Sequence, residues 1–83
     1  MSYEKVIQAS KTIIGTKQAV KAMHAGQVSQ LFIALDADSW VTDPAILLAK
    51  EIGIPVHLVK SKRELGKACS INVNAAVVAI TAK

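Results

Sequence analysis

The sequence predicts an α/β fold, a three-layer α/β/α sandwich on a small, largely parallel or mixed sheet of about four strands. Two observations support this. Short β-branched or apolar runs alternate along the chain with segments whose apolar residues recur at helical spacing. In addition, 52% of the 83 residues are hydrophobic, which suffices for one small core. We therefore expect a single domain over residues 1–83.

The first third of the chain predicts a strand followed by an amphipathic helix. Residues 3–11 suit a short helix or turn, and the β-branched run at 12–14 suits a strand stopped by Gly15. From residue 16 to residue 25, a period of about 100° per residue gathers apolar and polar side chains on opposite arcs. The apolar arc holds Ala19, Val20, Ala22 and Met23, and the polar arc holds Lys17, Gln18 and Lys21. Gly26 is expected to end this helix.

The remaining elements alternate in the same way. The apolar run in residues 29–35 predicts a strand buried on both faces, followed by a turn at 36–39. Asp43 and Pro44 read as a cap and a first helical position, opening a helix that ends at Gly53. A strand follows at 55–59, then a helix at 62–68, and a last strand at 75–81. The fourth helix starts with a capping box, in which Ser61 precedes Glu64 by three residues.

Charge and cysteine content restrict the class of protein. Ten Lys and Arg against six Asp and Glu give a formal charge of +4, concentrated at residues 11–21 and 60–67, which favours anionic partners. No apolar run reaches the length of a membrane span, and no targeting signal is visible at the N-terminus. The single Cys69 cannot form an internal disulfide, so we expect a cytoplasmic protein.

No group of residues predicts catalysis or a metal. Cys69 suits a small core thiol, His24 the end of a helix, and His57 a strand. The acids Asp36, Asp38 and Asp43 lack the spacing of a calcium loop and suit turn and cap roles. We expect no enzyme activity, no cofactor and no metal.

The start of the helix at Gly15 carries unusual charge. Exposed N–H groups and a partial positive charge occupy a helix N-terminus, where acids are favoured, yet Thr16, Lys17, Gln18 and Lys21 stand there. A solvated charged face and contact with nucleic acid are equal alternatives on composition alone. The local conflict favours nucleic acid, because N–H groups and lysines bind phosphate and Gln18 can hydrogen-bond base edges.

A second candidate surface lies in the polar segment 70–74 before the last strand, which consists of Ser70, Ile71, Asn72, Val73 and Asn74. Its two apolar residues either begin the last strand or, in an exposed loop, pack under an unstacked base, and both alternatives stay open. Structured RNA offers unstacked bases, whereas regular DNA does not.

Four stretches, in their order and spacing, give the chain a family resemblance over residues 12–80. They are 15–21 (GTKQAVK), 31–38 (LFIALDAD), 53–56 (GIPV) and 61–69 (SKRELGKAC). The chain resembles the kink-turn-binding proteins of the ribosomal protein L7Ae/L30e superfamily, and its short length resembles the small bacterial members.

The resemblance implies binding to sharply bent RNA with tandem sheared G·A pairs. The helix after Gly15 would enter the widened major groove, with Lys17, Gln18 and Lys21 in contact. Asp38, Lys62 and Ile71 would form a pocket for one extruded nucleotide, closed by the loop from Ser70 through Asn72 to Val73. Three departures are present: Lys17-Gln18 for Asn-Glu, Ser70 for glycine, and Val73 for arginine.

The sequence thus predicts a monomeric, non-enzymatic protein that binds and stabilises kink-turns in ribosomal RNA, an mRNA leader or another non-coding RNA. A protein–protein adaptor on the same fold is the alternative.

Overall fold

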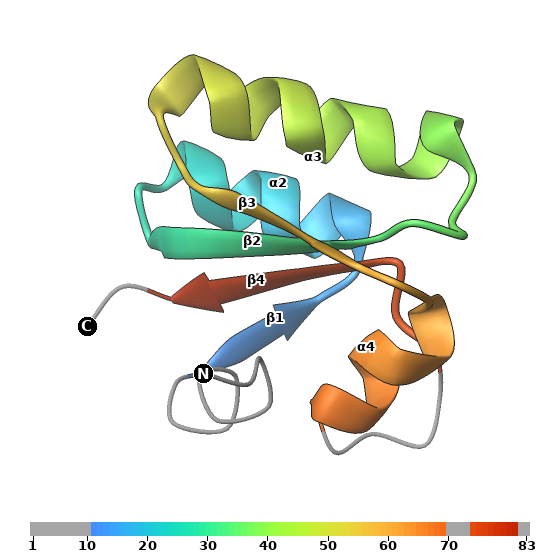
Figure 1. Ribbon diagram of the computed structural model, residues 1–83. Helices are drawn as coiled ribbons and strands as arrows, with labels where there is room; N and C mark the ends of the chain where they lie inside the picture. Colours follow the sequence, from blue (N-terminus) through green and yellow to red (C-terminus); the bar gives the residue numbers. More distant parts are fainter. Residues whose placement is uncertain (1–10, 70–73, 82–83) are drawn as a thin grey trace.

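A computed structural model describes residues 11–69 and 74–81, which form a mixed sheet covered by helices (Figure 1). The elements follow one another in the order β1 (Thr12–Ile14), α2 (Thr16–His24), β2 (Val28–Ala34), α3 (Ser39–Ile52), β3 (Val56–Val59), α4 (Lys62–Ala68) and β4 (Val77–Thr81). The expected alternation of strands and helices is confirmed.

The four strands lie in the spatial order β1-β4-β2-β3. β4 pairs antiparallel with both β1 and β2, whereas β2 and β3 pair in parallel. Three strands therefore run in one direction, and the last strand of the chain is inserted between two of them in the opposite direction. The sheet is therefore mixed, which agrees with the predicted largely parallel or mixed sheet.

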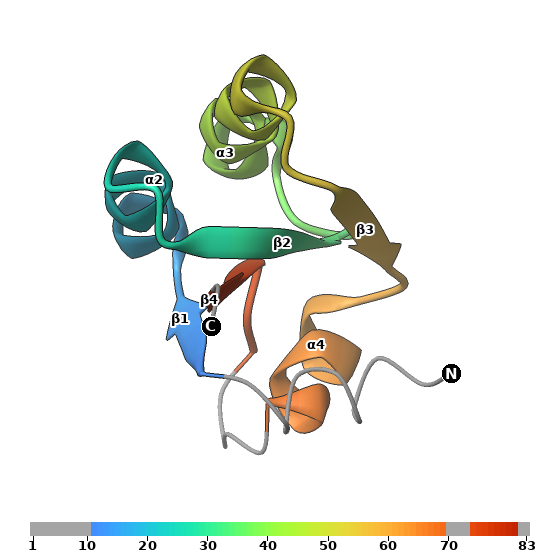
Figure 2. The same cartoon turned by 90° about the vertical axis from the view of Figure 1, so that its left-hand side faces the viewer.

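Helices cover both faces of the sheet, as Figures 1 and 2 show: α2 and α3 lie on one face and α4 on the other. Each face has its own hydrophobic cluster. Leu31 and Ile33 of β2 pack under α2 and α3, and Phe32 and Ala34 of the same strand pack with α4. The prediction that this strand is buried on both faces is confirmed for residues 31–34.

The local signals at two helices are also confirmed. The Ser61 hydroxyl accepts a 3.1 Å hydrogen bond from the backbone N–H of Glu64, as the capping box requires. Helix α3 ends at Gly53, which adopts a left-handed conformation with φ 80° that favours glycine.

The predicted start of α3 is wrong. The helix begins at Ser39 with Asp38 in the N-cap position, so Asp43 and Pro44 lie inside it. Thr42 is 5% exposed, and its burial packs the extra turn onto the core. Pro44 lacks the N–H that would bond the carbonyl of Trp40, and the Pro44 side chain is exposed in the first half of the helix.

The expected helix or turn at residues 3–11 falls almost entirely outside the described residues. Within residues 11–69 and 74–81, no helix is long and apolar enough to cross a membrane.

The strand directions bring the starts of the helices together. Because β1, β2 and β3 are parallel to one another, their carboxyl ends lie at one edge of the sheet, where the antiparallel β4 begins. Each described helix follows one of these strands, so α2, α3 and α4 all begin at this edge, on the right of Figure 1. We call it the loop edge.

Candidate functional site

Gly15 turns the chain from β1 into α2 at the loop edge. Its φ of 100° and ψ of 150° lie in a region that side-chain-bearing residues rarely adopt. Its N–H donates to the carbonyl of Val77 at 2.9 Å, and its own carbonyl accepts from the N–H of Ala19 at 2.9 Å. These bonds fix the first turn of α2 against the start of β4.

The polar side chains of α2 face solvent. Lys17, Gln18 and Lys21 are exposed, whereas the opposite arc of the helix is buried. No acidic residue lies in the first turn, and no side chain caps it. The N–H groups there, with the partial positive charge of the helix end, are available to an anion that the lysines also attract.

Thr16 ties α2 to α3. Its hydroxyl donates a 2.9 Å hydrogen bond to the carbonyl oxygen of Val41, in the first turn of α3. The Thr16 side chain therefore holds two helix starts side by side, which leaves its backbone N–H as the group that can face a ligand.

The start of α4 is held from two sides. Asp36 Oδ1 accepts a 2.7 Å hydrogen bond from the N–H of Lys62, and the Lys62 carbonyl accepts a 3.1 Å bond from the N–H of Ala75. Asp38 is exposed at the N-cap position of α3, where its side chain makes no capping hydrogen bond. Its carboxylate is thus not used by the helix that it precedes.

These bonds form a closed circuit around the loop edge. Thr16 joins α2 to α3, Asp36 joins the β2–α3 connection to α4, Ala75 joins α4 to the approach to β4, and Val77 joins β4 to α2. Ala75 and Val77 are two residues apart, or about 7 Å along an extended chain. The starts of α2 and α4, far apart in the sequence, are therefore neighbours in the fold.

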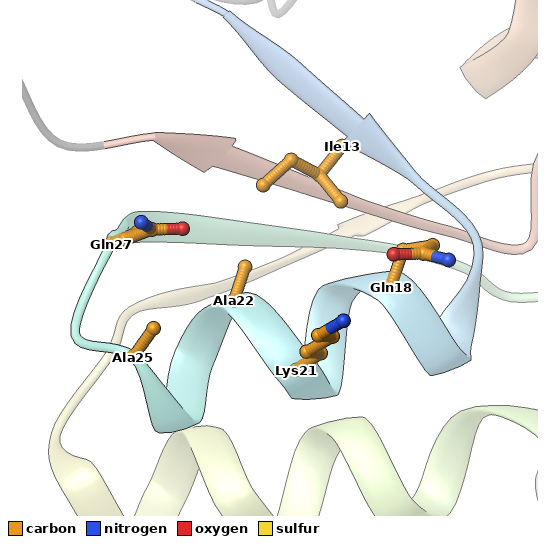
Figure 3. Close-up of a pocket in the computed structure, with 6 residues that line it drawn as sticks. All are labelled: Ile13, Gln18, Lys21, Ala22, Ala25 and Gln27. Atoms are coloured by element: carbon orange, nitrogen blue, oxygen red, sulfur yellow. The ribbon is translucent and has the colours of Figure 1, made fainter.

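An open groove of about 370 Å³ runs along the flank of α2 (Figure 3). Gln18 and Gln27 lie at its opposite ends, and Lys21 lies between them. Ile13, Ala22 and Ala25 provide the rest of its lining. The groove combines amide and ammonium groups with apolar surface, so it suits a ligand that carries both anionic and flat apolar parts.

Comparison with known proteins identifies the family. A sequence model of the ribosomal protein L7Ae/L30e/S12e/Gadd45 family matches residues 2–83. The chain belongs to this family.

Relatives are similar over nearly their whole length. The chain is 51% identical over 80 residues to an RNA-binding protein of a Geobacillus species, covering 96% of this chain and 98% of that protein. It is 48% identical, with the same coverage, to RNA-binding protein YbxF of Geobacillus stearothermophilus. An RNA-binding protein of Staphylococcus aureus is 39% identical over 82 residues, again with 96% and 98% coverage.

Solved structures share the fold. The 15.5kD RNA binding protein of Giardia lamblia matches with a TM-score of 0.86 and 26% identity, covering 98% of this chain and 68% of that one. A Bacillus halodurans protein of unknown function matches with a TM-score of 0.84 and 24% identity, covering 96% and 80%. Both place this L7Ae-family chain on a common α/β scaffold.

Most of the predicted site residues of this L7Ae-family chain meet at the loop edge. Gly15, Thr16, Lys17, Gln18 and Lys21 belong to α2 and its entry turn. Asp38 and Lys62 begin α3 and α4 at the same edge. Ser70, Ile71, Asn72 and Val73 lie outside the described residues. Asn74, which follows them, is exposed, and the next residue is held to the start of α4.

Cys69 and His57 lie among side chains that give them structural roles. Burial raises the pKa of the Cys69 thiol, which lies beside the hydrophobic cluster of α4, so the nucleophilic thiolate is disfavoured. The His57 ring stacks on Phe32 with 4.9 Å between centroids. In the described part of the chain, no three His, Cys, Asp or Glu side chains gather where they could hold a metal ion.

Two exposed apolar side chains at the loop edge were not predicted. Trp40, in the first turn of α3, is 77% exposed, and Leu35, expected inside a buried strand, is 60% exposed in the turn after β2. A helix begun at Ser39 would have placed Trp40 opposite the buried Thr42, because two residues turn a helix by about 200°. Because the predicted helix began at Asp43, Trp40 was not assigned to a helix and its exposure was not predicted.

Proposed function

We propose that the protein binds structured RNA and recognises and stabilises kink-turns. The observation that carries this proposal is the circuit of hydrogen bonds that fixes three helix starts at one edge of the sheet, with basic and amide side chains turned outward. Its relatives in Geobacillus are named RNA-binding proteins, which supports the same class of ligand.

The first part of the proposed interface is the start of α2. Lys17 and Lys21 would neutralise phosphates, and Gln18 would hydrogen-bond base edges at the tandem G·A pairs. Gly15 has no side chain, which allows the RNA backbone to approach the exposed N–H groups of the first turn. The groove beside Gln18 and Lys21 extends this surface along α2.

The second part is the region around the start of α4. Asp38 and Lys62, with Ile71, would hold an extruded nucleotide, and the segment from Ser70 through Asn72 to Val73 would close over it. The short path from Ala75 to Val77 between the two parts supports a single continuous interface. An RNA that contacts both parts of this interface must bring two of its own segments close together, as a sharp bend does.

The mechanism that we propose is selection of the bent conformer. A kink-turn exchanges between extended and bent forms, and a rigid protein surface that contacts only the bent form shifts this equilibrium by its difference in affinity. The hydrogen bonds of the loop edge supply the required rigidity, because helix starts held at fixed positions cannot adapt to an extended duplex.

We further propose that the protein acts as a monomer in the cytoplasm, on ribosomal or other structured RNA, and without catalysis. The single cysteine suits a reducing compartment. The raised pKa of the half-buried Cys69 thiol supports a binding protein over an enzyme that uses this residue as a nucleophile.

The test compares two RNA duplexes of equal length and charge. One carries an internal loop followed by tandem G·A pairs, and the other has Watson–Crick pairs at those positions. At fixed salt and without Mg²⁺, we expect binding at least about tenfold tighter to the first, in line with base contacts worth ~1–3 kcal/mol each. Dyes on the two RNA ends should report a bend that the protein stabilises.

Equal affinity for both RNAs would contradict kink-turn recognition. No salt-dependent RNA binding at all would favour the protein–protein adaptor on the same fold.

A further inference from the structure

Trp40 is a large apolar side chain with no place in the core. Trp40 is the single Trp of the chain and is 77% exposed, whereas the aromatic ring of Phe32 lies in the core and is 1% exposed. The buried face of α3 consists of Thr42, Ala45 and Ala49, and Trp40 lies on the opposite side of the helix. Packing of this domain therefore does not explain the residue.

The position of Trp40 places it at the loop edge, next to the start of α2. Trp40 is the second residue of α3, and its neighbour Val41 accepts the hydrogen bond from Thr16. Thr16 in turn precedes Lys17, so the indole and this ammonium group belong to adjoining first turns of two helices. Side chains in a helix lean toward its N-terminus, which directs a first-turn residue over the loop edge and not along the helix.

The loop edge as a whole favours an anionic partner with flat apolar groups, although the charged residues nearest to Trp40 in the sequence are the exposed acids Asp38 and Asp43. Lys17, Lys21 and Lys62 lie on the helices that begin at this edge, and the chain carries a formal charge of +4. Combining a basic surface with an exposed aromatic ring is how proteins hold single-stranded nucleotides, because every base has a face that can stack. Structured RNA presents unpaired bases at bends and loops.

We propose that Trp40 stacks on an unpaired nucleobase of the bound RNA and adds affinity beyond the contacts of α2 and the Asp38–Lys62 region. The inference rests on the proposed RNA-binding function and names one further residue of that interface. The nucleotide is one that flanks the bend, since Trp40 points away from the sheet while the proposed nucleotide pocket lies toward α4.

A protein partner is the competing occupant of this surface. Leu47 is 66% exposed and lies seven residues further along α3, so it shares the outer face with Trp40. An apolar protein surface would use both residues. A nucleobase held at the loop edge would use Trp40 alone, because Leu47 lies about 10 Å further from that edge.

The single Trp makes the test direct. Wild-type protein is titrated with the kink-turn duplex while Trp emission is followed, and the Kd is measured independently by a mobility shift. We expect quenching of the emission that saturates with binding. Trp40→Ala should weaken RNA binding roughly 5- to 150-fold, the range of one base–aromatic stack. Trp40→Phe should retain most of the affinity, and the matched control Leu47→Ala should retain all of it.

The outcomes separate the two proposals. If wild-type protein gives no mobility shift with any structured RNA, the proposed function fails and the inference fails with it. If wild-type protein binds, but its Trp emission is unchanged at saturation and Trp40→Ala binds equally well, the stacking inference alone is wrong. Equal losses in Trp40→Ala and Leu47→Ala would also overturn it, because a stack at the loop edge does not involve Leu47.

Discussion

Asp36 Oδ1 accepts a 2.7 Å hydrogen bond from the backbone N–H of Lys62, so a residue of the β2–α3 connection caps a helix that begins 26 residues later. Ser61 satisfies a different N–H of the same helix, that of Glu64. The first turn of α4 is thereby fixed both by its own sequence and by the loop that carries Asp38. This coupling sets the distance between two of the proposed RNA-binding residues.

Replacing Asp36 should therefore destabilise the domain. We expect Asp36→Ala to lower the free energy of unfolding by about 1 kcal/mol, since it leaves the N–H of Lys62 without its carboxylate partner. In a domain of this size that corresponds to a fall in Tm of roughly 4–8 °C. Thermal or urea unfolding measures it. The matched control is Asp38→Ala, which removes the same charge from a side chain that makes no capping hydrogen bond; equal losses would contradict the role of Asp36.

Local signals in the sequence were sufficient for the helix and strand boundaries that depend on neighbouring residues. The pair Ser61 and Glu64 specified the start of α4, and Gly53 specified the end of α3, because capping and left-handed backbone are decided within a few residues. The Asp43-Pro44 pair misled for the same reason. Its local preference for a helix start was overridden by the burial of Thr42 and by the bond from Thr16 to α3.

The arrangement of the candidate site was harder to predict from the sequence than the helix boundaries. The exposed arc of α2 follows from helical periodicity, so Lys17, Gln18 and Lys21 could be assigned to one surface in advance. Inserting β4 between β1 and β2 is a long-range choice that no local pattern encodes, and it brings Val77 to Gly15. The proximity of the α2 and α4 starts follows from that insertion. Only the family resemblance had assigned residues of both helix starts to one RNA-binding site.

Gly15 should be among the residues least tolerant of a side chain. No atom lies within 4 Å of a Cβ added at Gly15 or at Gly26, so any cost arises from the backbone conformation alone. We expect Gly15→Ala to destabilise the domain by about 1–3 kcal/mol, because its φ and ψ fall in a region nearly restricted to glycine.

Gly26→Ala is the control for Gly15→Ala, because φ 71° lies near the left-handed helical region. It should cost only about 1 kcal/mol. Urea unfolding of the two variants checks the order, and a larger loss in Gly26→Ala would refute this explanation of Gly15.

Cys69 should react slowly with alkylating reagents at neutral pH. Burial raises the pKa of its thiol, so the thiolate that attacks the reagent is scarce in the folded protein. We expect alkylation to be slower than in the urea-unfolded chain at pH 7.5 and to accelerate as the pH rises toward the folded-state pKa. Mass spectrometry of the single cysteine follows the reaction. A folded-state rate equal to the unfolded-state rate would show that the thiol is not protected.

The same shift of the Cys69 pKa links stability to pH. A pKa that is raised in the folded state favours the protonated thiol, so its stabilising contribution is complete below the unfolded-state pKa and is lost as the pH rises through the folded-state value. The difference in unfolding free energy between wild type and Cys69→Ala should therefore shrink at alkaline pH. A difference that stays constant with pH would contradict the linkage.

Lys21 should contribute one phosphate contact to RNA binding. We expect Lys21→Ala to weaken binding of the kink-turn duplex and to reduce the slope of log Kd against log salt concentration by about one unit. A salt titration by mobility shift or calorimetry measures the slope. Lys50→Ala is the matched control, because Lys50 is exposed in the last turn of α3, at the opposite end of that helix from the loop edge. If the two variants change the slope equally, the effect is one of net charge and not of a contact.

Gln18 should decide which base pairs the protein prefers. Its side chain is exposed and lines the groove along α2, where an amide can donate to and accept from base edges. We expect Gln18→Ala to lose roughly 1–3 kcal/mol of discrimination between the duplex with tandem G·A pairs and the duplex with those pairs inverted to A·G. Gln27→Ala, at the other end of the same groove, removes an identical amide and should leave this discrimination intact. If inversion of the pairs weakens Gln18→Ala and wild type by the same factor, Gln18 does not read the bases, and its contribution is limited to the shape of the groove.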